Sequence, residues 1–159
     1  MTMSDITEGK KAPDFSLPAS TGGQISLSQF KGKSHVVLYF YPKDMTPGCT
    51  TEACAFRDLK GDFDKAGAVI LGVSADSVDS HGKFTAKHRL NFPLLSDTDR
   101  KVCAQYGVYK EKSLYGRLFM GIERTTFVID KKGVIRKIYP KVKVEKHADQ
   151  VLKFLRTLA

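Results

Sequence analysis

The sequence has few of the features that assign a protein to a class at first sight. Its 159 residues include only three cysteines, an odd and low number that does not form a disulfide framework. The longest apolar run, VVLYFYP, is far too short to cross a bilayer, and the polar start MTMSDITEGKKAPDF lacks the apolar stretch of a secretory signal. We therefore expect a cytoplasmic protein with no membrane partner, whose thiols are kept reduced.

Several chemical motifs are also missing. There is no Cys-x-x-Cys, no phosphate-binding loop, no nucleophilic serine elbow and no dinucleotide fingerprint. The histidines are scattered without zinc-like spacing, so we expect surface or helix-end positions for them: His35, His81, His88 and His147. We expect neither a metal nor a bound cofactor.

The bulk composition is that of an ordinary globular protein, with 42% hydrophobic and 27% charged residues. A chain of this length can bury a sizeable core, so a single domain over residues 1–159 is expected. The net charge of +9 is unevenly spread: eleven Lys or Arg and four Asp or Glu between Lys110 and Lys146 give +7 there. A solvated basic face explains this, and docking of an acidic protein or non-specific nucleic-acid contact are the alternatives. No nucleic-acid-binding signature accompanies the charge, so we expect no nucleic-acid ligand.

The hydrophobic pattern predicts an α/β fold. HVVLYFYP and AVILGVSA are continuous β-branched and aromatic runs, typical of strands buried on both faces of a parallel sheet. Helices are predicted over 47–65, 77–89 and 98–105, followed by a loop rich in Gly, Lys and Tyr. APDFSL and GGQISL predict an N-terminal hairpin, TTFVID-KKG-VIRKIY predicts a second, and an amphipathic helix closes the chain. This order is compatible with a thioredoxin-like fold carrying an N-terminal β-hairpin extension and a helical insertion.

The segment FYPKDMTPGCTTEACAF, residues 40–56, places a cysteine at a helix start. Thr46 is a good N-cap, and Pro47 suits the first helical position. Gly48 permits close approach of another group. Cys49 then lies in the first turn, where free backbone N–H groups and the helix dipole favour a thiolate.

The same segment resembles a known active site. Pro42, Thr46 and Cys49 form the Pro-x-x-x-Thr-x-x-Cys arrangement typical of peroxiredoxins, and Cys54 resembles the resolving cysteine of their bacterioferritin-comigratory, or Q-type, subfamily. The likeness runs from APDFSL through GVSAD to RTTFVID, where Arg124 matches the active-site arginine.

The resemblance implies roles for these residues. Cys49 would attack a peroxide and become a sulfenic acid, while Arg124 would hold thiolate and peroxide in its fixed fork. Thr46 would hydrogen-bond to the substrate, although simple capping is its alternative role. Pro42 would shield the sulfur from water, and it would also end the strand.

Other residues are less defined. Arg124 could instead form an ordinary salt bridge with Glu123 or Glu52, and Glu52 could orient Arg124. Candidate walls of the peroxide pocket are Phe40, Tyr41 and the segment 118–121.

The spacing of Cys49 and Cys54 bears on how they could join. On an ideal helix, Cα atoms five residues apart are roughly 8.5 Å from each other and their side chains point about 140° apart. A disulfide needs Cα atoms within about 7 Å. On the helical wheel Cys49 falls on the apolar face and Cys54 near the polar one. We expect them to join only after the first turns unwind.

Cys103, in DRKVCAQYGV, is expected in the core, with an alternative role as a resolving partner. The resemblance implies a monomeric thioredoxin-dependent thiol peroxidase of the atypical 2-Cys type. Hydrogen peroxide and small organic hydroperoxides would be its substrates, and thioredoxin or a similar dithiol its reductant. Two other functions stay open: a thiol–disulfide oxidoreductase, which the missing Cys-x-x-Cys disfavours, and a redox-sensing basic binding module.

Overall fold

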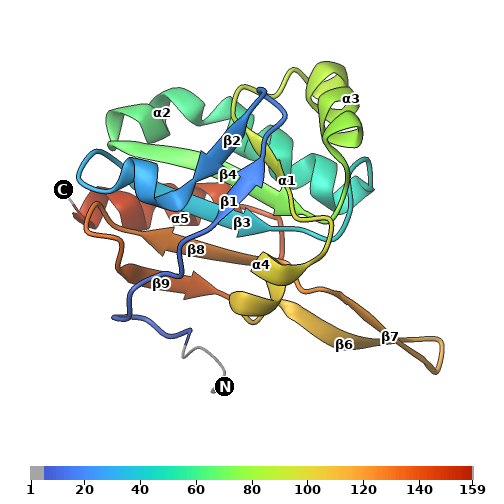
Figure 1. The fold of residues 1–159 in the computed structure, drawn as a ribbon. Helices are drawn as coiled ribbons and strands as arrows, with labels where there is room; N and C mark the ends of the chain where they lie inside the picture. Colours follow the sequence, from blue (N-terminus) through green and yellow to red (C-terminus); the bar gives the residue numbers. More distant parts are fainter. Residues whose placement is uncertain (1–5, 159) are drawn as a thin grey trace.

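A five-stranded mixed sheet forms the centre of the molecule (Figure 1). The computed structural model describes residues 6–158, so the first five residues of the polar N-terminal segment and residue 159 lie outside the description. The strand order is β5-β4-β3-β8-β9. These strands are β3 (His35–Phe40), β4 (Ala68–Ser74), β5 (Leu94–Ser96), β8 (Thr125–Ile129) and β9 (Ile135–Tyr139). The first three run parallel, and β8 pairs antiparallel with both β3 and β9.

The two apolar runs of the sequence form the central strands β3 and β4, as predicted. All six residues of β3 are buried, and so are six of the seven in β4. A strand covered on both faces needs no polar positions, which is why neither run alternates.

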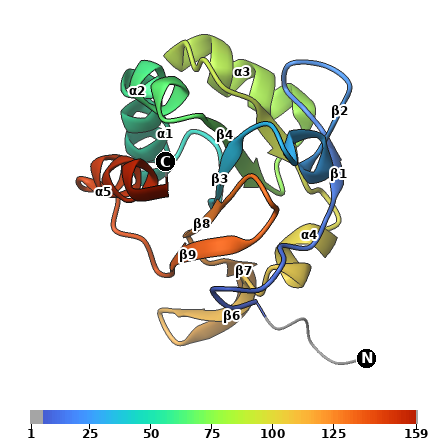
Figure 2. The ribbon, with the colours of Figure 1, turned by 90° about the vertical axis from the view of Figure 1, so that its left-hand side faces the viewer.

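Helices cover one face of the sheet and a mixed layer covers the other (Figure 2). The helical face carries α1 (Pro47–Asp58), α2 (Lys60–Lys65), α3 (Val78–His88) and α5 (His147–Leu155). The opposite face carries the N-terminal hairpin of β1 (Ser16–Pro18) and β2 (Gln24–Ser26), the short 3-10 helix η1 (Leu27–Phe30), and α4 (Lys101–Gln105). A last 3-10 turn, η2 (Arg156–Leu158), follows α5. None of the helices within residues 6–158 is long and apolar enough to cross a membrane.

The predicted helix over 47–65 is divided in the structure. Its break lies at Leu59, whose φ of −100° and ψ of 7° depart from helical values. The backbone N–H of Leu59 is shared between the carbonyls of Ala55 and Phe56, the tightened bonding that commonly ends an α-helix. After the break, Phe63 packs on Phe56 with ring centroids 5.7 Å apart. The apolar face is therefore kept although the helix is interrupted.

The segment after α4, predicted as a loop, is a β-hairpin instead. Strands β6 (Tyr109–Leu114) and β7 (Arg117–Ile122) pair antiparallel over their full lengths. The turn consists of Tyr115 and Gly116, with φ values of 52° and 78°. Two successive left-handed residues match the twist of a two-residue hairpin. The Tyr-Gly pair was the available signal, but tyrosine is not a usual residue at the first of these positions.

Gly72 of β4 leads to a prediction, because its missing side chain is occupied by neighbours. A Cβ atom there would lie 2.8 Å from Leu94 and 2.9 Å from the Tyr39 ring, which is itself stacked on Phe56. We expect Gly72→Ala to lower the free energy of unfolding by about 1–3 kcal/mol, since the aromatic ring cannot move aside.

The matched control is Gly82→Ala, at an exposed position of α3 where a Cβ meets nothing within 4 Å. This change should raise stability by about 0.5–1 kcal/mol, because alanine loses less backbone entropy in a helix. Urea unfolding of both variants measures the two values, and equal signs would contradict the packing argument.

Candidate active site

The loop between β3 and α1 sets the position of the first helical turn. Thr46 is extended, with φ −78° and ψ 153°, and Pro47 follows at the first helical position, as predicted. The expected capping hydrogen bond is absent. The Thr46 hydroxyl instead donates to the carbonyl of Lys43 at 2.9 Å, while the Thr46 carbonyl accepts from Thr50 N–H at 2.9 Å. The threonine side chain thus braces the loop, and the lone pairs of its oxygen remain available to accept a hydrogen bond.

Cys49 lies in this first turn with its side chain covered. Only 1% of it is exposed, and it belongs to the apolar cluster between the helices and the sheet together with Ala53 and Phe56. Cys54 is half-buried, and both cysteines are free thiols in an unbroken α1. The helical wheel therefore predicted their separation correctly.

Sheet register brings Arg124 to this cysteine across 75 positions of sequence. Phe40, the last residue of β3, pairs with Thr125, so Arg124 falls just beyond the end of β3 where the chain turns toward α1. The carbonyl of Arg124 accepts a hydrogen bond from Val142 N–H at 2.9 Å, which fixes its backbone from the other side. Strand pairing therefore places the guanidinium at the start of α1.

The guanidinium of Arg124 bridges two groups of α1. Its Nη2 lies 3.3 Å from Cys49 Sγ, and its Nη1 donates to Glu52 Oε1 at 2.7 Å. Both proposed interactions of Arg124, with the cysteine and with Glu52, are thus present at once. A planar group held at one end by a carboxylate presents its other N–H at a fixed angle.

Gly48 explains how the guanidinium reaches the sulfur. A Cβ atom at this position would lie 3.1 Å from Arg124 Nη2. The sequence indicated that Gly48 permits close approach, and the approaching group is the arginine side chain.

The charges of this cluster are strongly coupled because it is buried. Burial raises the pKa of Glu52 to about 7, although Arg124 opposes the shift. Burial alone would lower the pKa of Arg124, but the nearby Glu52 and Cys49 outweigh it and raise that pKa. Arg124 therefore stays cationic, and Glu52 gains or loses its proton close to neutral pH.

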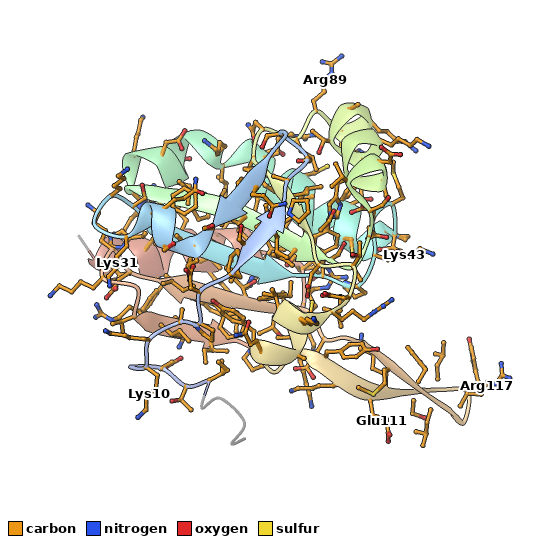
Figure 3. All side chains as sticks on the ribbon, in the orientation of Figure 1. Lys10, Lys31, Lys43, Arg89, Glu111 and Arg117 are labelled. Carbon is orange, nitrogen blue, oxygen red and sulfur yellow. The ribbon has the colours of Figure 1, made fainter. Side chains whose placement is uncertain are left out.

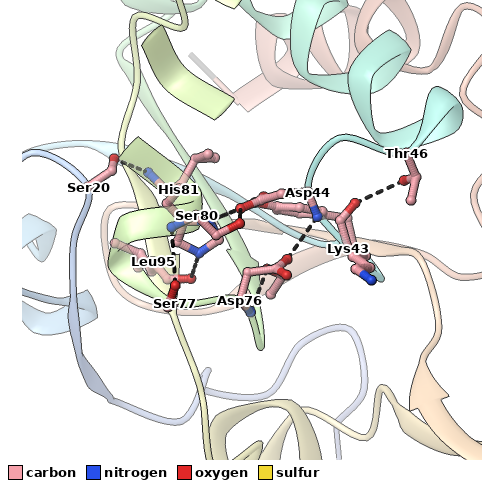
Figure 4. Close-up of polar contacts among 12 residues, drawn as sticks. Ser20, Lys43, Asp44, Thr46, Asp76, Ser77, Ser80, His81 and Leu95 are labelled. Atoms are coloured by element: carbon pink, nitrogen blue, oxygen red, sulfur yellow. Dashed lines mark hydrogen bonds and ion pairs between the residues drawn. The ribbon is translucent and has the colours of Figure 1, made fainter. Parts of the chain in front are cut away.

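A buried polar network lies beneath the loop and was not predicted from the sequence (Figure 4). The Asp44 carboxylate accepts from Tyr41 Oη at 2.6 Å and from Ser80 Oγ at 2.8 Å, and it lies 2.7 Å from His81 Nδ1. The backbone N–H of Asp44 donates to Asp76 Oδ2 at 2.8 Å. These contacts tie the loop to the start of α3 and to the end of β4.

His81 is the centre of this network. Its Nε2 lies 2.9 Å from the Leu95 carbonyl, which can only accept, so Nε2 carries a proton. Burial favours protonation of Asp44, yet the hydrogen bonds from His81, Tyr41 and Ser80 outweigh it and hold the pKa of Asp44 below its usual value. Both nitrogens of the His81 ring therefore face oxygen acceptors, the Asp44 carboxylate at Nδ1 and the Leu95 carbonyl at Nε2.

The surface or helix-end positions expected for the histidines are wrong for two of the four, His35 and His81. His81 is fully buried, and His35 and His147 are 7% and 3% exposed. His147 does begin a helix, α5, as expected. Ligand-type atoms of Asp44, Asp76 and His81 lie within 4.8 Å of one another, but each carries hydrogen bonds from the protein. Protein donors satisfy this cluster, so its geometry does not call for a metal.

Cys103 lies on the far side of the sheet from Cys49. It is fully buried in the other apolar cluster, and its backbone N–H donates to Asp97 Oδ2 at 2.7 Å. Burial, followed by the neighbouring Asp97, raises the pKa of the Cys103 thiol well above its usual value. These observations support the core position of Cys103 and separate it from Cys49.

Two expectations about the pocket need correction, and one is untested. Phe40 points into the cluster on the opposite face of the sheet, so it cannot line a pocket at Cys49, whereas Tyr41 shares the Cys49 cluster. Leu118, Phe119 and Met120 are 45–68% exposed on the hairpin and do not wall a closed pocket. Pro42 is an exposed residue two positions after the end of β3, and shielding of the sulfur by its ring stays a prediction.

Comparison with known proteins identifies the family of this chain. Residues 8–138 match the model of the AhpC/TSA family. The chain belongs to this family. It is 54% identical to a putative peroxiredoxin bcp of Coxiella burnetii, over 92% of this chain and 97% of that protein. It is 51% identical to peroxiredoxin Bcp of Bacillus subtilis, over 97% and 98% respectively.

Solved structures agree with this assignment. A cysteine-to-serine variant of peroxiredoxin Q from Xanthomonas campestris superposes with a TM-score of 0.90 at 47% identity, covering 96% of this chain and all of that one. A PrxQ variant from Xylella fastidiosa gives 0.91 at 40% identity, covering 98% of both. The thioredoxin-like fold is confirmed, and the chain is a thiol peroxidase, which acts on peroxides and is recycled by a thiol reductant.

Two buried groups of the site region should have opposite effects on stability. Glu52 has its pKa raised from 4.5 to about 7, so its contribution is present below pH 4.5 and is lost as the pH rises through about 7. Burial, with a smaller effect of Arg124, lowers the pKa of His147 from 6.5 to about 4. Its contribution is present above pH 6.5 and is lost as the pH falls through about 4. Each is worth roughly 3 kcal/mol, and they offset each other.

Single variants should reveal each slope. In Glu52→Gln, the free energy of unfolding should rise between pH 4.5 and 6.5, because Glu52 no longer opposes His147 and His35, whose pKa burial also lowers. In His147→Gln it should fall over the same range, because the large pKa shift of Glu52 outweighs the shift of His35. Urea unfolding at several pH values measures both slopes, and parallel slopes in the two variants would show that these groups do not titrate as described.

Proposed function

We propose that Cys49 is the peroxidatic cysteine and that its reaction depends on the fork of Arg124. The supporting observation is the guanidinium that touches Cys49 Sγ at 3.3 Å while Glu52 holds its other nitrogen at 2.7 Å. A cation fixed in this way can stabilise the charge that develops on the peroxide oxygens as the sulfur attacks. The proposed substrates are hydrogen peroxide and small organic hydroperoxides. A Xanthomonas campestris relative, 49% identical, has been studied for alkyl peroxide reduction.

The first step would form one bond and break another. The Cys49 thiolate attacks the terminal oxygen of ROOH, the O–O bond breaks, and Cys49 becomes a sulfenic acid while RO⁻ takes a proton and leaves as ROH. Thr46 would accept a hydrogen bond from the substrate, and the support for this is that its own proton is donated to the Lys43 carbonyl. Pro42 would limit the access of water.

The second step would join Cys49 to Cys54. The Cys54 thiol condenses with the sulfenic acid, which releases water and forms an intramolecular disulfide. Both residues lie in α1 at an i, i+5 spacing, about 8.5 Å between Cα atoms in an ideal helix, so the first turns must unwind. The exposed disulfide would then be reduced by thioredoxin or a similar dithiol. Because both cysteines belong to one chain, a monomer is sufficient to form this disulfide. We further propose that the protein is a single domain over residues 1–159 and acts in the cytoplasm.

Three cysteine variants test these assignments in an NADPH-coupled assay with thioredoxin and its reductase. Cys49→Ser should abolish peroxide consumption, because the nucleophile is gone. Cys54→Ser should react once with peroxide and then stop, because no disulfide forms. Cys103→Ser should turn over normally, since it lies across the sheet. Mass spectrometry of peroxide-treated wild type should find a 49–54 link, and an oxidised monomer without that link would exclude Cys54 as the resolving cysteine.

Gly48→Ala tests the role of the arginine without touching a charged group. The new Cβ would displace Arg124 Nη2 by a few tenths of an ångström, because the Glu52 ion pair holds the other end of the guanidinium. We expect the second-order rate constant with hydrogen peroxide to fall roughly threefold to tenfold, since geometry at the reacting centre controls the barrier.

The midpoint temperature of thermal unfolding should be no lower for Gly48→Ala than for the wild type, because alanine has the higher helix propensity. Gly61→Ala in α2 is the matched control, where a Cβ meets nothing within 4 Å. If stopped-flow rates of the two variants were equal, contact between Arg124 and Cys49 would not govern the attack.

A further inference from the structure

The β6–β7 hairpin stands apart from the body of the protein (Figures 1 and 3). Its two strands pair only with each other and not with the central sheet. The Tyr115–Gly116 turn lies at the far end of the projection. An isolated two-stranded hairpin has only marginal stability in water. The side chains that this hairpin exposes therefore need an explanation.

The hairpin concentrates the exposed apolar side chains of the molecule. Seven large hydrophobic side chains are exposed within residues 6–158, and five of them belong to this hairpin. They are Leu114, Tyr115, Leu118, Phe119 and Met120. Tyr115, at the turn, is 96% exposed and Leu118 is 68% exposed. Such clustering on one projection differs from the scattered single residues of an ordinary surface and marks an interaction site.

These apolar side chains occupy both faces of the hairpin. The register pairs Leu114 with Arg117 and Lys112 with Phe119, which puts these four on one face. It pairs Ser113 with Leu118, and Glu111 with Met120, on the other face. A flat partner would cover only one of these faces. An environment that surrounds the tip would cover both.

The charge of the hairpin is also one-sided. Residues 109–122 carry Lys110, Lys112 and Arg117 against the single acid Glu111. Lys110 pairs with Glu123 at the base of the hairpin, 3.3 Å away. Arg117, next to the turn, has no carboxylate within ion-pair distance in the described part of the chain, and it points away from the body in Figure 3. The apolar tip therefore carries an unpaired cation.

The base of the hairpin adjoins the reactive site. Strand β7 ends at Ile122, two residues before Arg124, and Lys112 Nζ donates to the Ile122 carbonyl. Arg124 and Cys49 are both near enough to influence the pKa of Lys112, which burial and Arg124 lower and which Glu123 and Cys49 raise. The hairpin that carries the exposed tip therefore leads at its base to the Cys49 site.

Contrary to the expectation from the sequence of no membrane partner, we propose that the β6–β7 hairpin is a docking finger for lipid bilayers with anionic headgroups, which brings the Cys49 site to hydroperoxides formed in the lipid. Docking itself rests on the exposed side chains and charges of the hairpin, and the substrate class rests on the proposed function. Apolar side chains on both faces can enter the boundary between headgroups and acyl chains, and an aromatic ring and a cation at the tip suit the headgroup level.

A lipid surface fits better than the other occupants. A second copy of this chain would bring another net charge of +9 to the same place, so self-association through the cationic tip is disfavoured. An acidic protein would satisfy the charge, but only a deep cleft would cover both apolar faces. An anionic bilayer meets both conditions without a specific shape.

The chemistry at the surface would balance as it does in solution. The Cys49 thiolate takes the terminal oxygen of a lipid hydroperoxide, the O–O bond breaks, and the lipid leaves as an alcohol after gaining a proton. The dithiol reductant supplies the two electrons that restore Cys49.

Binding can be measured directly, because the chain contains no tryptophan. Tyr115→Trp places a single tryptophan at the tip of the hairpin. The matched control is Val78→Trp, which places a single tryptophan on α3 where the native side chain is also an exposed hydrophobic. With vesicles of phosphatidylcholine and phosphatidylglycerol, Trp at 115 should shift to the blue and be quenched by brominated acyl chains. Phosphatidylcholine alone, or added salt, should weaken the signal, and Trp at 78 should not respond.

A second variant connects docking to turnover. Tyr115→Ser with Leu118→Ser should weaken co-sedimentation with anionic vesicles about tenfold or more, because two apolar anchors are lost. It should reduce turnover of phospholipid hydroperoxide in those vesicles by a similar factor while leaving hydrogen peroxide turnover in solution unchanged.

Each other outcome has a definite meaning. No vesicle binding by a protein that still consumes hydrogen peroxide overturns the docking proposal and leaves the proposed function intact. Vesicle binding without any peroxidase turnover supports docking and overturns the proposed function. An unchanged vesicle affinity with a raised KM for the dithiol protein would assign the hairpin to a protein partner and overturn the lipid proposal.

Discussion

The site depends on one buried ion pair, between Arg124 and Glu52. The carboxylate holds one nitrogen of the guanidinium at 2.7 Å, which leaves the other aimed at the Cys49 sulfur at 3.3 Å. Burial makes this pair costly unless its geometry is good, and it also makes the charges effective where they meet the sulfur. Glu52 and Cys49 come from consecutive turns of one helix, so the fork can hold both only while the start of α1 is intact.

That helix start is held in turn by its supports. Thr46 braces the loop through the Lys43 carbonyl, and Asp44 fastens it to α3 through His81. The same supports would have to loosen locally if Cys54 is to reach Cys49. A peroxidase of this kind needs a folded turn for attack and an unfolded turn for resolution, and a short run of hydrogen bonds at the helix start is a suitable boundary between them.

The β6–β7 hairpin differs from the rest of the fold in the exposure of its apolar side chains. The body covers nearly all of its apolar residues between the sheet and its two layers, whereas β6 and β7 expose theirs. Their exposure weakens the argument for a pocket wall at 118–121 and favours contact with something outside the chain. Because Arg124 follows the end of β7 by two residues, one continuous segment connects that external surface to the reactive cluster.

The sequence by itself determined the central strands, the helix start at Thr46 and Pro47, and the separation of Cys49 from Cys54, because these depend on local periodicity and on neighbours within one turn. It missed the β6–β7 hairpin and the helix break at Leu59. The match to Pro42, Thr46, Cys49 and Arg124 came from resemblance to a family. Only the tertiary structure decided that Arg124 grips Glu52 and Cys49 together, that His81 is buried against Asp44, and that Phe40 faces the other layer. Those facts depend on strand register and on which face of the sheet a side chain meets, and neither is encoded by local spacing.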